Sequence, residues 1–202
     1  MSGAEARLLS AAAAGYALAW VLSWVSLVFS VKRAAPWIQW ILVAGLGLHA
    51  GAIVVRWVSI GHPPLFGTFE TALAGAWFVL VVTLLLLRQA PGLQPLALVT
   101  VPAALLIGAH GLLFPTKAYP LTISEQSLWV DLHALAGWLA LASYIVAFAC
   151  AVGLLVGLRG HGAGLSPPGL LDDYMFRCLS LGFLAQTVLI TSGAYYSFIL
   201  FG

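Results

Sequence analysis

The sequence predicts an all-α polytopic membrane protein that forms a single helical domain over residues 1–202, and three observations support this. Hydrophobic residues make up 62% of the chain and charged residues 7%, whereas soluble domains average about 45–50% apolar and about 25% charged residues. Long apolar runs recur, each near the ~20 residues that a helix needs to cross a bilayer. The alternating segments of about ten residues that are typical of an outer-membrane barrel are absent.

Six apolar runs are read as transmembrane helices. They are Leu8–Val31, Trp37–Ile60, Thr68–Leu87, Pro95–Phe114, Leu128–Leu158 and Tyr174–Phe201. The first run has no charge and exceeds the apolar core of about 7–15 residues in a signal peptide, so we expect a retained helix. The third is followed by the turn signal Ala90-Pro91-Gly92. The fifth is long enough to tilt, and the sixth begins after the polar pair Asp172-Asp173.

Several classes of function are excluded by composition and motifs. A net charge of +2 is too small to attract nucleic acid. The two cysteines, Cys150 and Cys178, lie in apolar runs and form no CxxC motif, so neither thiol redox chemistry nor a cysteine metal site is expected. The chain contains no phosphate-binding loop, dinucleotide fingerprint, zinc-protease motif or nucleophile elbow.

Basic residues predict the orientation, because cytoplasmic loops carry an excess of Lys and Arg. One set of connections holds Lys32, Arg33, Arg88, Arg159 and Arg177. The other set holds Arg7, Arg56 and Lys117. Five against three places the first set in the cytoplasm, so both termini are predicted on the outer side.

With this orientation, four of the five histidines fall in the outer half or near mid-membrane. They are His62, His110, His133 and His49, whereas His161 lies in an inner Gly-rich loop. This distribution suggests an outward-facing site, although outer loops also simply tolerate polar residues.

His49 shares one helical face with Gly45, Ala52 and Arg56, because these residues follow one another at steps of three or four. An ionisable residue at membrane depth is costly and usually faces the bundle interior. Two readings stay open: a histidine that hydrogen-bonds to a neighbouring helix, and a cofactor ligand or proton carrier.

His133 begins a stripe of mostly small residues on the fifth run. The stripe is His133, Gly137, Ala140, Tyr144, Ala147 and Ala151. A histidine at the mouth of such a groove suits an axial ligand of a flat macrocycle, and haem iron commonly binds imidazole. The competing reading is ordinary helix packing, which small residues also favour.

Glu70 lies in the first turn expected for the third helix, where the helix dipole favours a carboxylate and Thr68 is expected as the N-cap. Its role is therefore either purely structural or that of a partner for Arg56. A guanidinium at this depth needs an anion, so we expect Arg56 to pair with Glu70 or with an anionic group such as a haem propionate.

Three segments, in order, together resemble the cytochrome c assembly family of haem-handling membrane proteins, of the CcsA/CcmC type with its HemX-like relatives. The first carries Arg56, Gly61, Pro63-Pro64 and Phe69-Glu70. The second carries Trp129, His133 and Tyr144. The third carries Asp172, Arg177, Gly182-Phe183 and Gly193-Ala194.

The resemblance implies a protein that holds haem on the outer membrane face for attachment to apocytochrome c. It implies that His133 flanks this haem and binds its iron, and it assigns a weaker cofactor role to His49. Structural or interaction roles are expected for Glu70, Asp172 and Arg177. Relatives commonly carry Asn at the position of Gly67.

The sequence also departs from the family pattern. The family's Trp-rich outer loop would begin at Gly202, where the sequence ends, and all eight Trp lie at or before Trp138. We therefore expect that a second membrane protein supplies the missing haem loop, that His110 or His62 substitutes as a ligand, or that haem handling has been lost.

The leading interpretation is a haem-handling protein of cytochrome c maturation in a bacterial plasma (inner) membrane. The expected partners are the lipid bilayer, apocytochrome c and a second membrane protein. Binding to nucleic acid is not expected. Arg56 and His110 join His133 and His49 as candidate cofactor-binding residues. The alternatives are a non-catalytic scaffold subunit and a HemX-like regulator of haem synthesis. No catalytic residue is predicted, and whether the protein is an enzyme stays open.

The predicted orientation can be tested with topology reporters. A reporter that is active only outside the cytoplasm should give a signal when it is fused after Gly202, because the helix count is even and the basic bias places the termini outside. A cytoplasmic signal from this fusion would contradict both the orientation and the outward position of His133.

Overall fold

The computed structural model describes residues 1–117, 121, 127–158 and 166–201, and these residues form helices and connecting turns with no strand. The α-helices are α1 (Gly3–Val28), α2 (Ala35–Ile60), α3 (Thr68–Gln89), α4 (Ala97–Gly111), α5 (Leu128–Leu158) and α6 (Pro168–Phe201). Two short 3₁₀ helices, η1 (Lys32–Ala34) and η2 (Pro91–Leu96), precede α2 and α4. The all-α prediction with six helices is therefore confirmed for the described residues.

Two helices begin five or six residues earlier than the sequence analysis predicted, and local signals explain why. Helix α1 starts at Gly3 rather than Leu8 because Ser2 and Glu5 form a capping box, in which each side chain bonds to the backbone N–H of the other. Helix α6 starts at Pro168 rather than Tyr174. Proline suits the first helical position, where no N–H donor is needed.

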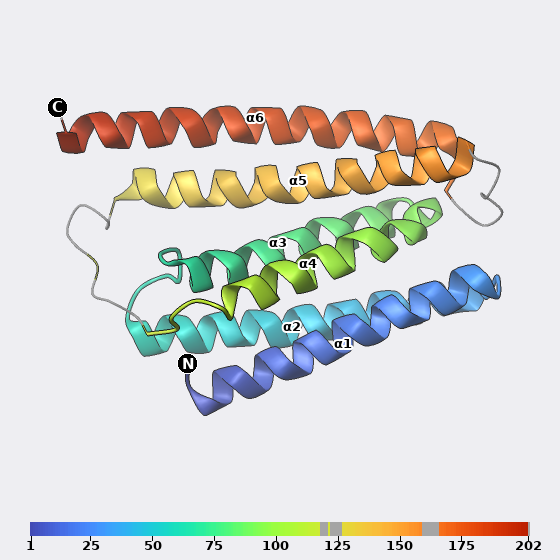
Figure 1. The fold of residues 1–202 in the computed structure, drawn as a ribbon, viewed down its shortest axis with the longest axis horizontal. Helices are drawn as coiled ribbons and strands as arrows, with labels where there is room; N and C mark the ends of the chain where they lie inside the picture. Colours follow the sequence, from blue (N-terminus) through green and yellow to red (C-terminus); the bar gives the residue numbers. More distant parts are fainter. Residues whose placement is uncertain (118–120, 122–126, 159–165, 202) are drawn as a thin grey trace.

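The helices are arranged as three antiparallel pairs, α1–α2, α3–α4 and α5–α6, with the α3–α4 pair between the other two (Figure 1). Successive helices run in opposite directions, so the two termini lie at the same end of the bundle. This end also holds the α2–α3 connection and the start of α5. We call it the terminal end; that it faces outward stays a prediction.

Helix α3 is the most enclosed helix of the bundle. In an apolar stretch of 18 residues of α3, 61% of the residues are buried, whereas the corresponding share is 22% in α1 and in α6. The helix contacts α2, α4 and α5. Small buried residues, Ala72, Ala74, Gly75 and Ala76, allow these neighbours to approach its backbone closely.

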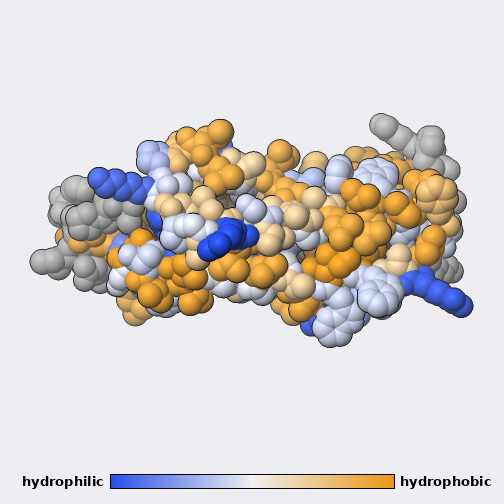
Figure 2. Space-filling model, turned by 90° about the horizontal axis from the view of Figure 1, so that it is seen from below, coloured by the Kyte–Doolittle hydropathy of each residue, from blue (hydrophilic) through white to orange (hydrophobic). Residues whose placement is uncertain are grey.

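Large apolar side chains cover the outside of the bundle. Among those at least 60% exposed are Phe29, Trp37, Trp40, Leu106, Phe176, Phe183 and Phe198. Figure 2 shows one face on which hydrophobic surface predominates and strongly hydrophilic surface is restricted to small areas. Six helices have the length and composition to cross a membrane, and we therefore treat the chain as an integral membrane protein.

Polar side chains within the bundle bond to backbone carbonyls of other helices. Trp20 Nε1 donates to the Leu98 carbonyl at 3.1 Å. Trp77 Nε1 donates to Leu46 at 3.2 Å. Such bonds suit a bilayer, where no water is available to satisfy a lone donor.

Gly45 permits the close approach of α1 and α2. A Cβ atom at this position would lie 2.6 Å from Cε1 of the Tyr16 ring, which is too close for any real contact. Gly47, two residues later on the same helix, has nothing within 4 Å of its Cβ position.

We predict that Gly45→Val destabilises the protein by about 1–3 kcal/mol, because overpacking forces the two helices apart. The matched control is Gly47→Val, which makes the same chemical change at an open position. Thermal unfolding in detergent measures the difference. Equal melting temperatures for the two variants would refute the packing role of Gly45.

Candidate functional site

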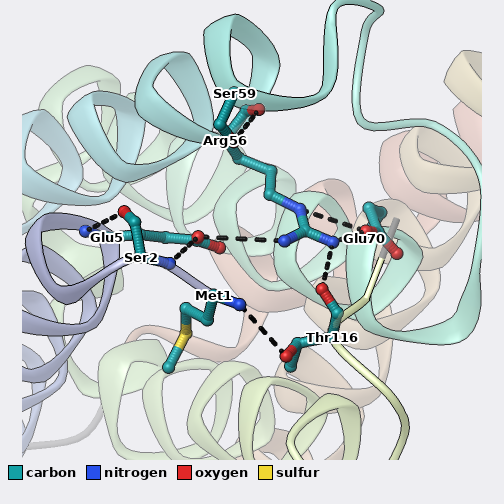
Figure 3. Close-up of polar contacts among 7 residues, drawn as sticks. All are labelled: Met1, Ser2, Glu5, Arg56, Ser59, Glu70 and Thr116. Atoms are coloured by element: carbon teal, nitrogen blue, oxygen red, sulfur yellow. Dashed lines mark hydrogen bonds and ion pairs between the residues drawn. The ribbon is translucent and has the colours of Figure 1, made fainter. Parts of the chain in front are cut away.

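Arg56 lies on α2 near the terminal end of the bundle, and its guanidinium joins four segments (Figure 3). Its Nε donates to Glu70 Oε1 at 3.1 Å, and its Nη2 also contacts this oxygen. Nη2 donates to the Thr116 carbonyl at 2.7 Å, and Nη1 lies 3.8 Å from Glu5 Oε2. The Met1 amino group donates to Thr116 Oγ1 at 3.2 Å. We call Arg56, Glu5, Glu70 and Thr116 the Arg56 cluster.

Local sequence signals place both carboxylates of this cluster. Glu5 is the acidic member of the capping box of α1, so its carboxylate is held beside the first turn. Glu70 follows Gly67, which has φ +97° and whose Cβ, if present, would lie 2.5 Å from Glu70 Oε2. The expectation that Thr68 caps α3 is wrong, because Thr68 is already helical and Gly67 occupies the N-cap position without a side-chain bond.

The three charged side chains of the cluster are almost completely buried. Relative exposure is 0% for Glu5, 3% for Arg56 and 5% for Glu70. Each charge needs its partner, because an unpaired ion at this depth is far more costly than a paired one. Of the two partners expected for Arg56, the structure contains Glu70. The contacts of Arg56 with Glu5 and Glu70 fix the terminal ends of α1, α2 and α3 relative to one another.

His49 is buried on α2 and pairs with a residue of α1. Tyr16 Oη lies 3.3 Å from His49 Nδ1, while Nε2 of His49 has no hydrogen-bond partner among the described residues. A cavity of about 390 Å³ between α1, α3 and α4 is bordered by both residues and is otherwise almost entirely apolar. The structure thus contains the neighbouring-helix contact expected as one reading of His49; a role in cofactor binding stays a prediction.

His133 lies in the second turn of α5, at the terminal end, and its side chain is exposed. Its Nδ1 is 2.8 Å from the carbonyl oxygen of Leu189 on α6. Because a carbonyl only accepts hydrogen bonds, Nδ1 carries the proton in this contact, and in the corresponding neutral tautomer Nε2 has a free lone pair. Orientation of an imidazole through its second nitrogen is the arrangement found at metal-binding histidines.

The stripe of small residues that follows His133 packs against α6. A Cβ at Gly137 would lie 3.2 Å from Leu189 Cδ1, and the Tyr144 ring lies against Gly182. Helix α6 therefore fills the groove that the sequence predicts, and the packing interpretation explains the stripe beyond His133.

Two of the three other histidines, His62 and His110, lie among the described residues. His110 is exposed at the end of α4, with its ring centroid 5.0 Å from that of Phe114. His62 lies in the α2–α3 connection, and its Nδ1 is 2.9 Å from the Pro63 carbonyl oxygen. Both belong to the terminal end, as His133 does, whereas His161 lies outside the described residues.

Asp172 and Arg177 lie near the start of α6, at the end of the bundle opposite the Arg56 cluster. Both are exposed. Arg177 pairs with Asp173 one turn earlier, at 2.9 Å between Nη2 and Oδ2. An exposed pair of this kind contributes only about 0.3–0.5 kcal/mol, and neither residue is brought to the candidate site.

Sequence reasoning missed three contributors to these arrangements. Glu5 could have been found, because the Ser2–Glu5 spacing is a capping-box signal that starts the helix before Leu8. The carbonyls of Thr116 and Leu189 carry no sequence signal, since every residue has one.

Within the described ranges, no group of three or more His, Cys, Asp or Glu side chains is placed to hold a metal ion. The described residues therefore contain no site in which several side chains surround a metal ion. Among these residues, His133 has an exposed imidazole that a contact through Nδ1 orients, and His62 has a similar Nδ1 contact in a partly buried position.

Comparison with known proteins identifies one relevant similarity. The chain is 27% identical over 191 residues to the cytochrome c biogenesis protein CcsA of Synechococcus sp. (strain CC9311). The match covers 76% of the chain and 62% of the relative, so the chain spans less than two thirds of the relative's length. No protein-family model matches the chain, and no solved structure matches it.

We predict that Arg56→Gln destabilises the protein strongly, by about 3–5 kcal/mol, because it leaves two buried carboxylates without their cation. Arg177→Gln is the matched control, since it removes the same group from an exposed pair. Unfolding in detergent should show a large loss for the first variant and a change within about 0.5 kcal/mol for the second. Similar losses for both would rule out a special role of the Arg56 cluster.

Proposed function

Because the similarity to CcsA supports membership of the cytochrome c assembly family, we propose that this membrane protein acts in cytochrome c biogenesis. In this proposal it resides in a bacterial plasma membrane with the terminal end of the bundle outside. There it holds haem and presents it for attachment to apocytochrome c.

His133 is the residue that carries this proposal. It is exposed at the terminal end, and the Leu189 carbonyl holds the proton on Nδ1. The lone pair on Nε2 is therefore available to an iron ion, without the competing hydrogen bonds that occupy a buried histidine.

The residues around His133 fit a flat, largely apolar ligand. Trp129 lies one turn before His133, and its ring is 4.5 Å from that of Tyr195 on α6. Both rings are nearly half exposed, at 41% and 47%. When bound, haem supplies the iron and porphyrin chemistry; the chain binds the iron through His133 and offers aromatic surface beside it.

A second axial ligand is required to complete a six-coordinate site. The match covers 62% of CcsA, and we infer that a second membrane protein supplies the second ligand. His110, which is exposed at the same end, and His62 in the α2–α3 connection are the alternatives within the described residues.

Arg56 has a supporting role in this proposal. Its guanidinium donates to Glu70 and to the Thr116 carbonyl and lies beside Glu5, which supports a role in fixing the helix ends; a haem propionate is the other partner that the sequence analysis expects. His49 is further from the exposed surface and contacts Tyr16. Its cofactor role is therefore proposed only as secondary to that of His133.

An absorbance spectrum of the protein purified with its membrane partners separates the proposal from the two alternatives. A haem-holding protein should show a strong haem band with a nitrogen-ligated spectrum. A scaffold subunit or a regulator of haem synthesis should purify without a stoichiometric haem band, and this outcome would contradict the proposal.

We predict that His133→Gly lowers haem retention at least about tenfold, because one axial bond is lost, and that added imidazole partly restores the spectrum. His161→Gly, in the predicted inner loop, should leave the spectrum unchanged. If His133→Gly instead lowers only the yield of folded protein, with the same haem content per folded molecule, the ligand role is wrong.

A further inference from the structure

We propose that Gly193 of α6 is a positioning residue for His133. This inference rests on the proposed function, in which the imidazole of His133 binds iron. Gly193 touches no ligand in this proposal; it acts by keeping the ring of His133 against α6 in one orientation and one tautomer.

The first observation is the contact between the ring and the glycine. A Cβ atom at Gly193 would lie 2.8 Å from Cε1 and 2.9 Å from Nδ1 of His133. Real Cβ atoms essentially never approach other atoms so closely. Any other residue at this position must therefore displace the imidazole or separate α5 from α6.

The second observation is the hydrogen bond that the same contact permits. Leu189, whose carbonyl accepts from His133 Nδ1, lies four residues before Gly193 and so on the same face of α6. A helical side chain covers the turn that precedes its own Cα. A side chain at position 193 would therefore cover the Leu189 carbonyl, and glycine leaves this oxygen accessible to the imidazole.

Neighbouring contacts hold this turn of α6 in place. Ser192 Oγ donates to the Val188 carbonyl at 2.6 Å and lies 3.1 Å from that of Leu189. The contact between the rings of Trp129 and Tyr195 joins the two helices at the next turn. The backbone that faces His133 is thus fixed, and the position of the imidazole depends on the space that Gly193 leaves.

The chain offers a matched control on the same pair of helices. A Cβ at Gly182 would lie 2.7 Å from Cε1 of the Tyr144 ring on α5, a comparable overlap about three turns from His133. Gly182→Ala should therefore disturb the packing of α5 on α6 as Gly193→Ala does. It should leave the hydrogen bond of His133 intact.

The test uses ¹⁵N-histidine NMR of the full chain in detergent without haem, with His133 assigned by its own substitution. The wild type and Gly182→Ala should show a neutral His133 protonated on Nδ1, whereas Gly193→Ala should lose this tautomer preference. With haem added, Gly193→Ala should bind about 10–100-fold more weakly than Gly182→Ala, which is the usual cost of losing such a supporting contact.

The outcomes distinguish the inference from the proposed function. An Nε2-protonated His133 in the wild type would overturn the positioning role without any variant being needed, as would an unchanged signal in Gly193→Ala. If the tautomer changes in Gly193→Ala but the wild type binds no haem, the positioning role is supported and the proposed function fails.

Discussion

A guanidinium buried in a helical bundle must be neutralised where it lies, and the terminal end of this protein is arranged around that requirement. Arg56 is 3% exposed and contacts Glu5 of α1, Glu70 of α3 and the Thr116 carbonyl that follows α4. The capping box of α1 and the positive φ of Gly67 serve the same arrangement, because each places one carboxylate. The Arg56 cluster thus connects the terminal ends of α1, α2 and α3 with the segment that follows α4.

The α5–α6 pair depends on a different interaction. No residue of these two helices belongs to the Arg56 cluster; α5 packs on α3, and α6 is held mainly by α5. The small residues of α5 accept α6, and the histidine at the mouth of the stripe is left exposed with its Nδ1 bonded to Leu189. The bundle therefore combines a buried charge cluster at the terminal end of its first helices with an exposed imidazole on α5 that contacts α6. In the proposed function, the Arg56 cluster holds the helix ends in place and His133 binds the haem iron.

The sequence was sufficient for most of the fold, because composition and run length determine which segments cross a bilayer. It also predicted the shared face of Gly45, His49, Ala52 and Arg56, all of which are buried, and it gave Glu70 as one of two expected partners of Arg56. It failed at the starts of α1 and α6, where a capping box and a proline extend the helix into polar sequence. The partners of Arg56 and His133 that are backbone carbonyls could not be predicted, since only the packing of the helices selects one carbonyl among many. The sequence also could not predict which helix packs against the stripe of small residues on α5. Only the tertiary contacts show that this helix is α6.

In the proposed function, the terminal end of this bundle presents an imidazole with a free Nε2 to haem iron. Titration of the purified full chain with haemin in detergent, followed by absorbance, tests it most directly. Binding through His133 predicts a saturable shift of the main haem band at a ratio of one haem per chain, with a spectrum typical of nitrogen ligation. A spectrum that remains that of haemin in detergent alone, at every ratio of protein to haemin, would contradict the claim.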